Sequence, residues 1–273
     1  MTNTVLLKQV LAVPTQSGQE DQLIMFLLRH FQGKGFRFHV DQKLNIYVTK
    51  GHIVEGEAYP CFAAHTDSVH PVQPVTIVRA GDKLTAQDSQ GQPCGLGGDD
   101  KAGVFICLEM LEKFPVCKAV FFVEEEIGYR GSQASDPKWF EDVGYFIEFD
   151  SPCATIMTYR CCGLQLFPDD GPFSEALVPR AKKYGMTRWQ NHPYTDVLPI
   201  KERSDFPCLN LPAGYYKMHS SEEYVLITAV ANTISMTIDL VRALGHKRYV
   251  FPNDARRKSR PAFEVTALDC SGW

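Results

Sequence analysis

The stretch that most constrains this chain is an apolar run that ends directly in three carboxylates. Residues 119–123 (Ala-Val-Phe-Phe-Val) have the β-branched and aromatic composition of a buried central strand. Glu124, Glu125 and Glu126 follow at once, and their charges repel one another at neutral pH. Crowding these charges at the edge of a core is costly unless cations balance them. A solvated acidic loop also explains this stretch taken alone, so other features of the sequence have to distinguish the two interpretations.

The composition is that of a globular chain with no general attraction to polyanions. The 273 residues are 44% hydrophobic, and the formal net charge of −4 predicts binding to neither nucleic acid nor anionic membranes. Residues 1–30 lack a signal-peptide pattern, and no apolar run reaches the length of a membrane span. Cys61, Cys107 and Cys117 lie in apolar runs, which favours buried reduced thiols and a cytoplasmic location.

Predicted strands alternate with predicted helices along the chain. Apolar runs predict buried strands at residues 59–64, 118–123, 145–149 and 207–211. Helical spacing covers residues 100–114, and a capping box at Ser220-Ser-Glu-Glu223 opens a predicted helix over 221–244. This alternation predicts an α/β fold, a three-layer α/β/α sandwich around a mixed, mostly parallel sheet.

Metal-ligand residue types stand at the ends of these predicted elements. They are His65-Thr-Asp67, Asp99-Asp100, Glu124-Glu125-Glu126, Asp150 and His219. In open α/β sheets, ligands bind beyond the carboxyl ends of the strands. The pattern therefore predicts that these side chains gather into one cluster of carboxylate and imidazole.

Together these motifs resemble the co-catalytic dizinc exopeptidase superfamily, which includes peptidase T and zinc aminopeptidases. The matching stretches span residues 65–220 and come in the order of the superfamily. They are Ala64-His65-Thr66-Asp67, Gly97-Gly98-Asp99-Asp100-Lys101-Ala102-Gly103, Glu125-Glu126-Ile127-Gly128, Phe149-Asp150 and Met218-His219-Ser220. The resemblance implies a zinc-exopeptidase-like fold and a metal-dependent exopeptidase that hydrolyses short peptides.

The resemblance also implies a pair of Zn²⁺ ions. Asp99 would bridge them, His65 and Asp150 would complete one site, and Glu126 and His219 would complete the other. Two such ions carry four positive charges, which makes a carboxylate-rich pocket tolerable. Co²⁺ or Mn²⁺ can occupy similar ligands. In this superfamily the peptide bond after the bridging aspartate is often cis, which here is the bond from Asp99 to the next residue.

Two further carboxylates receive roles from the same resemblance. Glu125 would be the general base, which takes a proton from the attacking water and returns one to the leaving amine. Asp67 would accept the second N–H of the His65 imidazole and fix its ligating tautomer. The register with Glu124 as base and Glu125 as ligand stays open, although the Glu-Glu-Ile-Gly pattern favours Glu125 and Glu126.

The chain departs from many relatives in having no room for a lid. The stretch between Asp150 and His219 is too short for core elements and a separate domain of roughly 100 residues. The stretch between His65 and Asp99 holds a hairpin and little more. We expect a single catalytic domain over residues 1–250, followed by a surface tail over 251–273 that carries Arg256-Arg257-Lys258.

The substrate is the least constrained part of this prediction. Cleavage of short peptides from the N-terminus is expected first; a carboxypeptidase and an amidohydrolase that deacylates N-acyl amino acids are the alternatives. A non-catalytic relative is disfavoured, because such a protein has no need of Glu125. Candidate substrate-binding residues near the motifs are Arg203, Asp205, Tyr215 and Tyr216. No nucleic-acid or membrane partner is expected, and the sequence does not indicate an oligomer.

Overall fold

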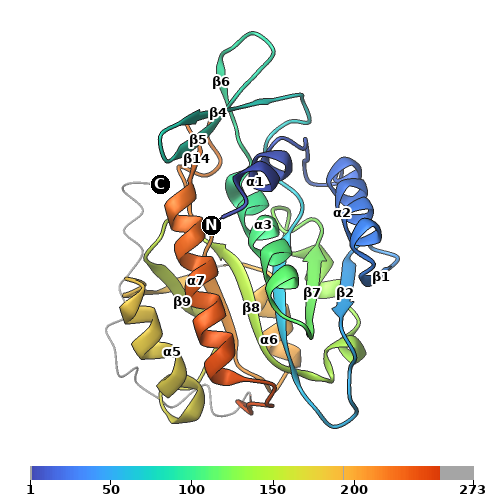
Figure 1. Ribbon diagram of the computed structural model, residues 1–273, viewed down its shortest axis with the longest axis vertical. Helices are drawn as coiled ribbons and strands as arrows, with labels where there is room; N and C mark the ends of the chain where they lie inside the picture. The colour runs from blue at the N-terminus through green and yellow to red at the C-terminus, as the bar shows by residue number, and fades with distance from the viewer. Residues whose placement is uncertain (1, 193, 253–273) are drawn as a thin grey trace.

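A computed structural model describes residues 2–192 and 194–252 (Figure 1). The basic part of the predicted tail, from residue 253 onward, lies outside the described residues. The larger of two sheets has nine strands in the order β1-β2-β7-β3-β8-β12-β9-β10, with β11 paired to β9. Its strands are β1 (Arg37–Val40), β2 (Ile46–Lys50), β3 (Tyr59–His65), β7 (Cys117–Phe122), β8 (Val143–Ser151), β9 (Ile156–Cys161), β10 (Leu164–Gln165), β11 (Arg188–His192) and β12 (Cys208–Pro212).

Four central strands of this sheet run parallel: β3 pairs with both β7 and β8, and β8 pairs with β12. Every residue of these four strands is buried. Strands buried on both faces are continuous apolar runs, which is why the sequence located all four correctly. Antiparallel pairs flank them, so the sheet is mixed. The predicted fold class is confirmed.

Helices cover both faces of the sheet. They are α1 (Thr4–Leu11), α2 (Asp21–Lys34), α3 (Gly98–Lys113), α4 (Arg130–Ala134), α5 (Gly171–Lys183), α6 (Val197–Arg203) and α7 (Ile227–Leu244), with a 3₁₀ turn at Pro137–Phe140. In Figure 1, α3 and α7 cross in front of the central strands and α6 lies behind them. By length and composition α7 could cross a membrane, but its buried side chains contact α3 and α5, as is typical of a core helix.

A second, five-stranded sheet stands beside the first. Its strands are β4 (Thr76–Ala80), β5 (Lys83–Gln87), β6 (Pro93–Cys94), β13 (Tyr215–Tyr216) and β14 (Tyr224–Leu226). The hairpin between His65 and Asp99 cannot satisfy its outer edge alone, and β14 pairs with β5 to cover it. The two ends of the motif region, 76–94 and 215–226, thereby meet at the top of Figure 1.

The predicted start of the last helix, at residue 221, is wrong. The helix begins at Ile227, and residues 224–226 are strand β14 instead. Glu223 does not cap this helix; its carboxylate binds the main chain before Asp99. A capping-box pattern describes local chemistry, and here long-range hydrogen bonds compete successfully for the same carboxylate.

Candidate active site

The predicted ligands meet because neighbouring parallel strands end at one edge of the sheet. His65 is the last residue of β3 and pairs with Phe122, the last residue of β7. Ala63 pairs with Glu148 of β8, so His65 and Asp150 lie together two residues further along. Glu125 and Glu126 follow β7 in the adjacent loop. The register of the sheet thus places imidazole and carboxylates side by side.

Asp99 lies between two histidines and shares its two oxygens between them. Oδ1 is 3.1 Å from Nε2 of His65, and Oδ2 is 3.3 Å from Nε2 of His219. Asp150 Oδ1 is 3.6 Å from Nε2 of His65, and Glu126 Oε1 is 3.0 Å from Nε2 of His219. The peptide bond from Asp99 to Asp100 is cis, as expected.

These residues form two overlapping triads, His65–Asp99–Asp150 and Asp99–Glu126–His219. Within each triad, one ligand atom per residue lies within 4.8 Å of the others. Zinc accepts imidazole and carboxylate ligands, and a close pair of ions needs one ligand in common. Asp99 is that common member. The donor set therefore fits two divalent cations held side by side.

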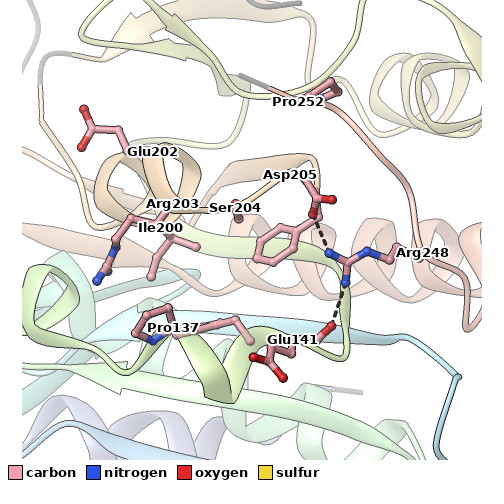
Figure 2. A pocket seen from close by; sticks show the side chains of 11 residues that line it. Pro137, Glu141, Ile200, Glu202, Arg203, Ser204, Asp205, Arg248 and Pro252 are labelled. Carbon is pink, nitrogen blue, oxygen red and sulfur yellow. Dashed lines mark hydrogen bonds and ion pairs between the residues drawn. The ribbon is translucent and has the colours of Figure 1, made fainter. Parts of the chain in front are cut away.

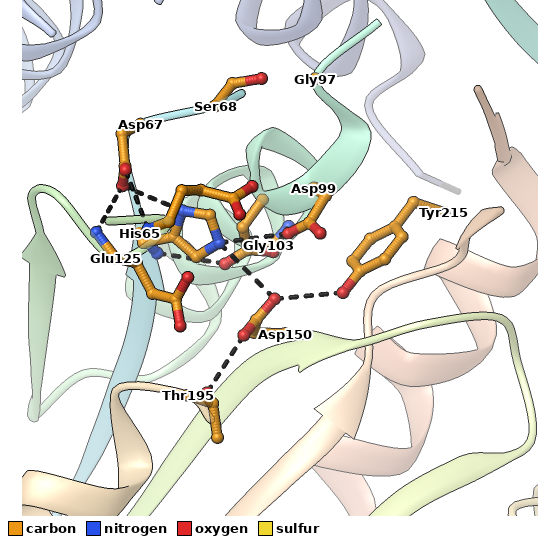
Figure 3. A network of polar contacts seen from close by, with 12 residues as sticks. His65, Asp67, Ser68, Gly97, Asp99, Gly103, Glu125, Asp150, Thr195 and Tyr215 are labelled. Atoms are coloured by element: carbon orange, nitrogen blue, oxygen red, sulfur yellow. Dashed lines mark hydrogen bonds and ion pairs between the residues drawn. The ribbon is translucent and has the colours of Figure 1, made fainter. Parts of the chain in front are cut away.

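Asp67 fixes both the first histidine and the loop that follows β7 (Figure 3). Its Oδ1 lies 3.3 Å from Nδ1 of His65 and accepts the main-chain N–H of Glu125 at 2.8 Å. Its Oδ2 accepts the main-chain N–H of Glu126 at 3.1 Å and the hydroxyl of Ser17 at 2.7 Å. One buried carboxylate thus orients His65 and sets the position of the loop that carries the catalytic candidate.

The geometry favours one of the two glutamate registers. Glu126 belongs to a triad, Glu125 lines the adjacent cavity, and Glu124 forms an ion pair with Lys43 at 2.7 Å. Burial raises the pKa of the Glu125 carboxyl well above its usual range; nearby carboxylates, Asp150 first, add to this rise, and His65 opposes it. A carboxylate with a raised pKa is suited to accept and return a proton near neutral pH.

The carboxylates of the cluster raise the pKa values of its two histidines. Contacts with Asp99 and Glu126 raise the pKa of His219 to about 10, although burial opposes them. Burial tends to lower the pKa of His65, but Asp150, Asp67 and Asp99 outweigh it and raise the pKa. The surrounding carboxylates thus favour the charged form of both imidazoles. A cluster of this kind favours cations, whether protons on the ligand nitrogens or bound metal ions.

A cavity of about 390 Å³ opens onto the cluster. Four triad members line it together with Glu125, namely Asp99, Glu126, Asp150 and His219. The other lining residues are Gly128, Tyr129, His192, Tyr194, Tyr215 and Met218. The Tyr215 hydroxyl donates to Asp150 Oδ1 at 3.1 Å (Figure 3). Within the described part of the chain, no lysine or arginine is among the lining residues. The space adjoining the triads is thus acidic on one part of its wall and largely aromatic on another.

The structure does not bring three other sequence candidates to this cavity. Arg203 and Asp205 line a separate cavity of about 460 Å³, where Asp205 forms an ion pair with Arg248 (Figure 2). Arg203 donates to main-chain oxygens of four residues, Ser132, Gln133, Ser135 and Pro199. The Tyr216 ring stacks on Tyr224, with centroids 5.0 Å apart.

Several residues at the site escaped the sequence analysis. Thr195 lies with its hydroxyl 3.1 Å from Asp150 Oδ2, and Glu148 and Asp196 are fully buried beside the cluster. Glu148 precedes Asp150 by two positions in a strand, so the period of two could have placed both on one face. Thr195 and Asp196 lie in the short connection between β11 and α6, far from Asp150 in sequence, and no local motif marks them.

No family model matches the sequence, and no curated protein matches it by sequence. Solved structures do match. Aminopeptidase PepT from Bacillus cereus ATCC 10987 superposes with a TM-score of 0.75 at 14% identity, covering 88% of this chain and 97% of that one. A Staphylococcus aureus tripeptidase gives 0.72 at 12% identity, covering 89% and 98%. A TET aminopeptidase from a marine-sediment Thaumarchaeota archaeon gives 0.67 at 13% identity, covering 87% and 95%.

These matches confirm the predicted resemblance at the level of the fold. The chain shares the backbone fold of these peptidases, although its identity to each of them is low. At such low identity the comparison establishes the course of the backbone. The chemistry has to be inferred from the side chains at the site.

Proposed function

We propose that this protein is a metal-dependent exopeptidase that removes residues from the N-terminus of short peptides. The observation that carries the proposal is the sharing of Asp99 by two ligand triads beside the buried carboxyl of Glu125. The peptidases that share the fold support the same reaction class.

The proposal assigns two Zn²⁺ ions to the triads, with Co²⁺ or Mn²⁺ as substitutes on the same ligands. His65 and Asp150 would hold one ion, Glu126 and His219 the other, and Asp99 both. Bound there, the ions would polarise the scissile carbonyl and acidify water. The exchange of ligand protons for ions would keep the charge of the buried cluster balanced.

Glu125 performs the proton transfers in this proposal. It accepts a proton from the attacking water and gives a proton to the leaving amine, so it must hold the proton between the two steps. Its raised pKa allows that. Asp67 holds the Glu125 main chain through a 2.8 Å hydrogen bond, which keeps the base beside His65. Tyr215 and Thr195 each contact one oxygen of Asp150 and orient that carboxylate.

The cavity supports a substrate bound by its N-terminal end. A volume of about 390 Å³ has room for one or two residues of a peptide and none for a folded protein. A carboxypeptidase must pair the C-terminal carboxylate of its substrate with a cation, and the described lining residues include no lysine or arginine. Carboxylates, which suit an α-ammonium group, are abundant. The buried thiols of Cys61, Cys107 and Cys117 agree with a cytoplasmic location.

A substrate panel tests this proposal. Aminoacyl-p-nitroanilides and di- and tripeptides should be hydrolysed, and N-acetylated versions of the same peptides should not. A chelator should abolish the activity, and Zn²⁺, Co²⁺ or Mn²⁺ should restore it. Cleavage of N-acyl amino acids alone would instead identify a deacylase, and release of C-terminal residues a carboxypeptidase.

A further inference from the structure

The cavity at the triads has an aromatic wall that the proposed hydrolysis does not require. The rings of Tyr129 and Tyr194 stack with centroids 6.0 Å apart and planes inclined by 19°. The Tyr194 side chain is 59% exposed, which is unusual for a large ring beside a buried acidic cluster. Met218, next to the triad member His219, lines the same space. A Cβ built on Gly128 would meet nothing within 4 Å, so this wall faces open volume.

We infer that Tyr129, Tyr194 and Met218 form the subsite for the side chain of the substrate's N-terminal residue. This inference rests on the proposed function. Aromatic rings bury large areas against apolar side chains and stack with other rings, and a methionine adapts its shape to both. Nothing in this group can pair with a charged substrate side chain. The subsite therefore favours large apolar or aromatic N-terminal residues over small or acidic ones.

Steady-state kinetics on a p-nitroanilide series test the subsite. The wild-type kcat/KM should be about tenfold higher for the Phe and Leu substrates than for Ala, and lowest for Glu. Tyr194→Ala and Tyr129→Ala should each lower kcat/KM for the Phe substrate about fivefold to tenfold, with little change for Ala. Phe38→Ala, which removes an exposed ring on β1, is the matched control and should change neither.

The outcomes distinguish a failure of the subsite from a failure of the proposed aminopeptidase function. A wild-type protein that cleaves all substrates alike, or tyrosine variants that lose Phe and Ala cleavage equally, would overturn the subsite alone. A wild-type protein that cleaves none of the series with metal supplied would overturn the proposed aminopeptidase.

A second, independent observation concerns Glu223, whose carboxylate is buried and fully occupied. Its Oε2 accepts the main-chain N–H groups of Leu96 and Gly97 at 3.1 and 2.7 Å and lies 2.9 Å from Nε2 of His70. Its Oε1 accepts the N–H of Asp99 at 3.0 Å. The side chain is 1% exposed, so these partners replace all of its water.

The loop that Glu223 holds is pressed closely against it. A Cβ on Gly98 would lie 2.8 Å from Cγ2 of Val225 and 3.3 Å from Oε1 of Glu223, which explains the glycine. Glu223 follows His219 within the connection from β13 to β14. One carboxylate thus ties the loop that carries Asp99 to the segment that carries His219, two parts of the chain more than a hundred residues apart.

The geometry points to Glu223 as a positioning residue that sets the spacing of Asp99 and His219 and, through it, the affinity of both triads for divalent ions. Glutamine at this position has one acceptor oxygen and two N–H donors, so it cannot accept from three main-chain N–H groups. The Asp99 loop would then shift away from the geometry that its two oxygens need.

Metal titration of the apoprotein tests this role without relying on activity. Glu223→Gln should weaken Zn²⁺ binding about tenfold to a hundredfold in competition with a chromophoric chelator. It should also change the visible absorption of the Co²⁺-loaded protein, which reports ligand geometry. Glu222→Gln is the matched control: this neighbour is exposed and pairs with Lys217, so affinity and spectrum should stay as in the wild type.

A second, smaller substitution keeps the test decisive if Glu223→Gln does not fold. His70→Ala leaves the carboxylate and its three main-chain donors in place and removes one partner, so it should weaken Zn²⁺ binding less than Glu223→Gln does. Wild-type affinity and spectrum in a folded Glu223→Gln protein would overturn the role. If that protein does not fold, wild-type affinity in His70→Ala would overturn it.

Discussion

Two of the cavities in this molecule differ in how their charges are satisfied. In the cavity of about 460 Å³, Asp205 pairs with the permanent charge of Arg248, and Arg203 is fully engaged with main-chain oxygens. In the cavity of about 390 Å³, the ion pairs of Asp99, Asp150 and Glu126 are all with histidine. Histidine can give up its proton and ligate a metal, whereas arginine cannot. Exchangeable charge, and not volume, distinguishes the cavity at the candidate active site.

Removal of the shared ligand, Asp99, should have the largest effect of the substitutions considered. Asp99→Ala should lose both ions and lower kcat/KM by at least about a thousandfold, because each triad loses its common member. Metal analysis of the purified protein and peptide hydrolysis are the measurements. Arg248→Ala, at the other cavity, should keep full metal content. Wild-type metal content in the Asp99 variant would refute the shared site.

Removing the base should separate chemistry from metal binding. Glu125→Gln should keep both ions and lower kcat about 10²-fold to 10⁴-fold, with KM little changed. Glu124→Gln should retain turnover, since that carboxylate pairs with Lys43. If the Glu125 variant loses metal while the Glu124 variant loses turnover, Glu124 is the base and Glu125 a metal ligand.

The raised pKa of His219 should make metal uptake depend on pH. The pKa of His219 in the apoprotein is about 10, so binding of an ion at neutral pH must release its proton, and affinity should rise with pH up to about 10. The same shift has the opposite sign for stability. The folded pKa exceeds the unfolded value of 6.5, so its contribution to apoprotein stability is complete below about pH 6.5 and is lost as the pH rises through about 10.

Isothermal titration calorimetry in buffers of different ionisation enthalpy measures that proton release, and thermal melts of the apoprotein measure the stability. His219→Gln should remove most of both pH dependences. Affinity for Zn²⁺ that is flat between pH 6 and 9 in the wild type would contradict the assignment of protonated ligands.

The mildest expected effect is on activity at the second cavity. Arg203→Ala should lower the free energy of unfolding by about 1–3 kcal/mol, because main-chain oxygens of α4 and α6 lose their donor. The kcat/KM of the folded fraction should stay unchanged. Chemical denaturation and peptide hydrolysis are the measurements. A selective rise in KM would instead return Arg203 to the substrate-binding role that its sequence position suggested.

The comparison also shows why local patterns identified some residues and misjudged others. His65, Glu126 and Asp150 stand where an apolar run ends, and Asp99 and His219 stand just before predicted helices. A single segment contains each of these signals. Arg203 stands beside such residues in sequence, yet its side chain turns toward α4. Proximity along the chain says little about the direction of a side chain after a helix.

The sequence by itself determined the central strands, the ligand types at their ends and the acidic character of the site. These follow from the composition of short segments and from the rule that parallel strands end at one edge. Only the tertiary structure decided the second sheet, the role of Glu223 and the arrival of Thr195 and Asp196 beside Asp150. Each of these depends on contacts between distant segments, which compete with local preferences and leave no periodic trace in the chain.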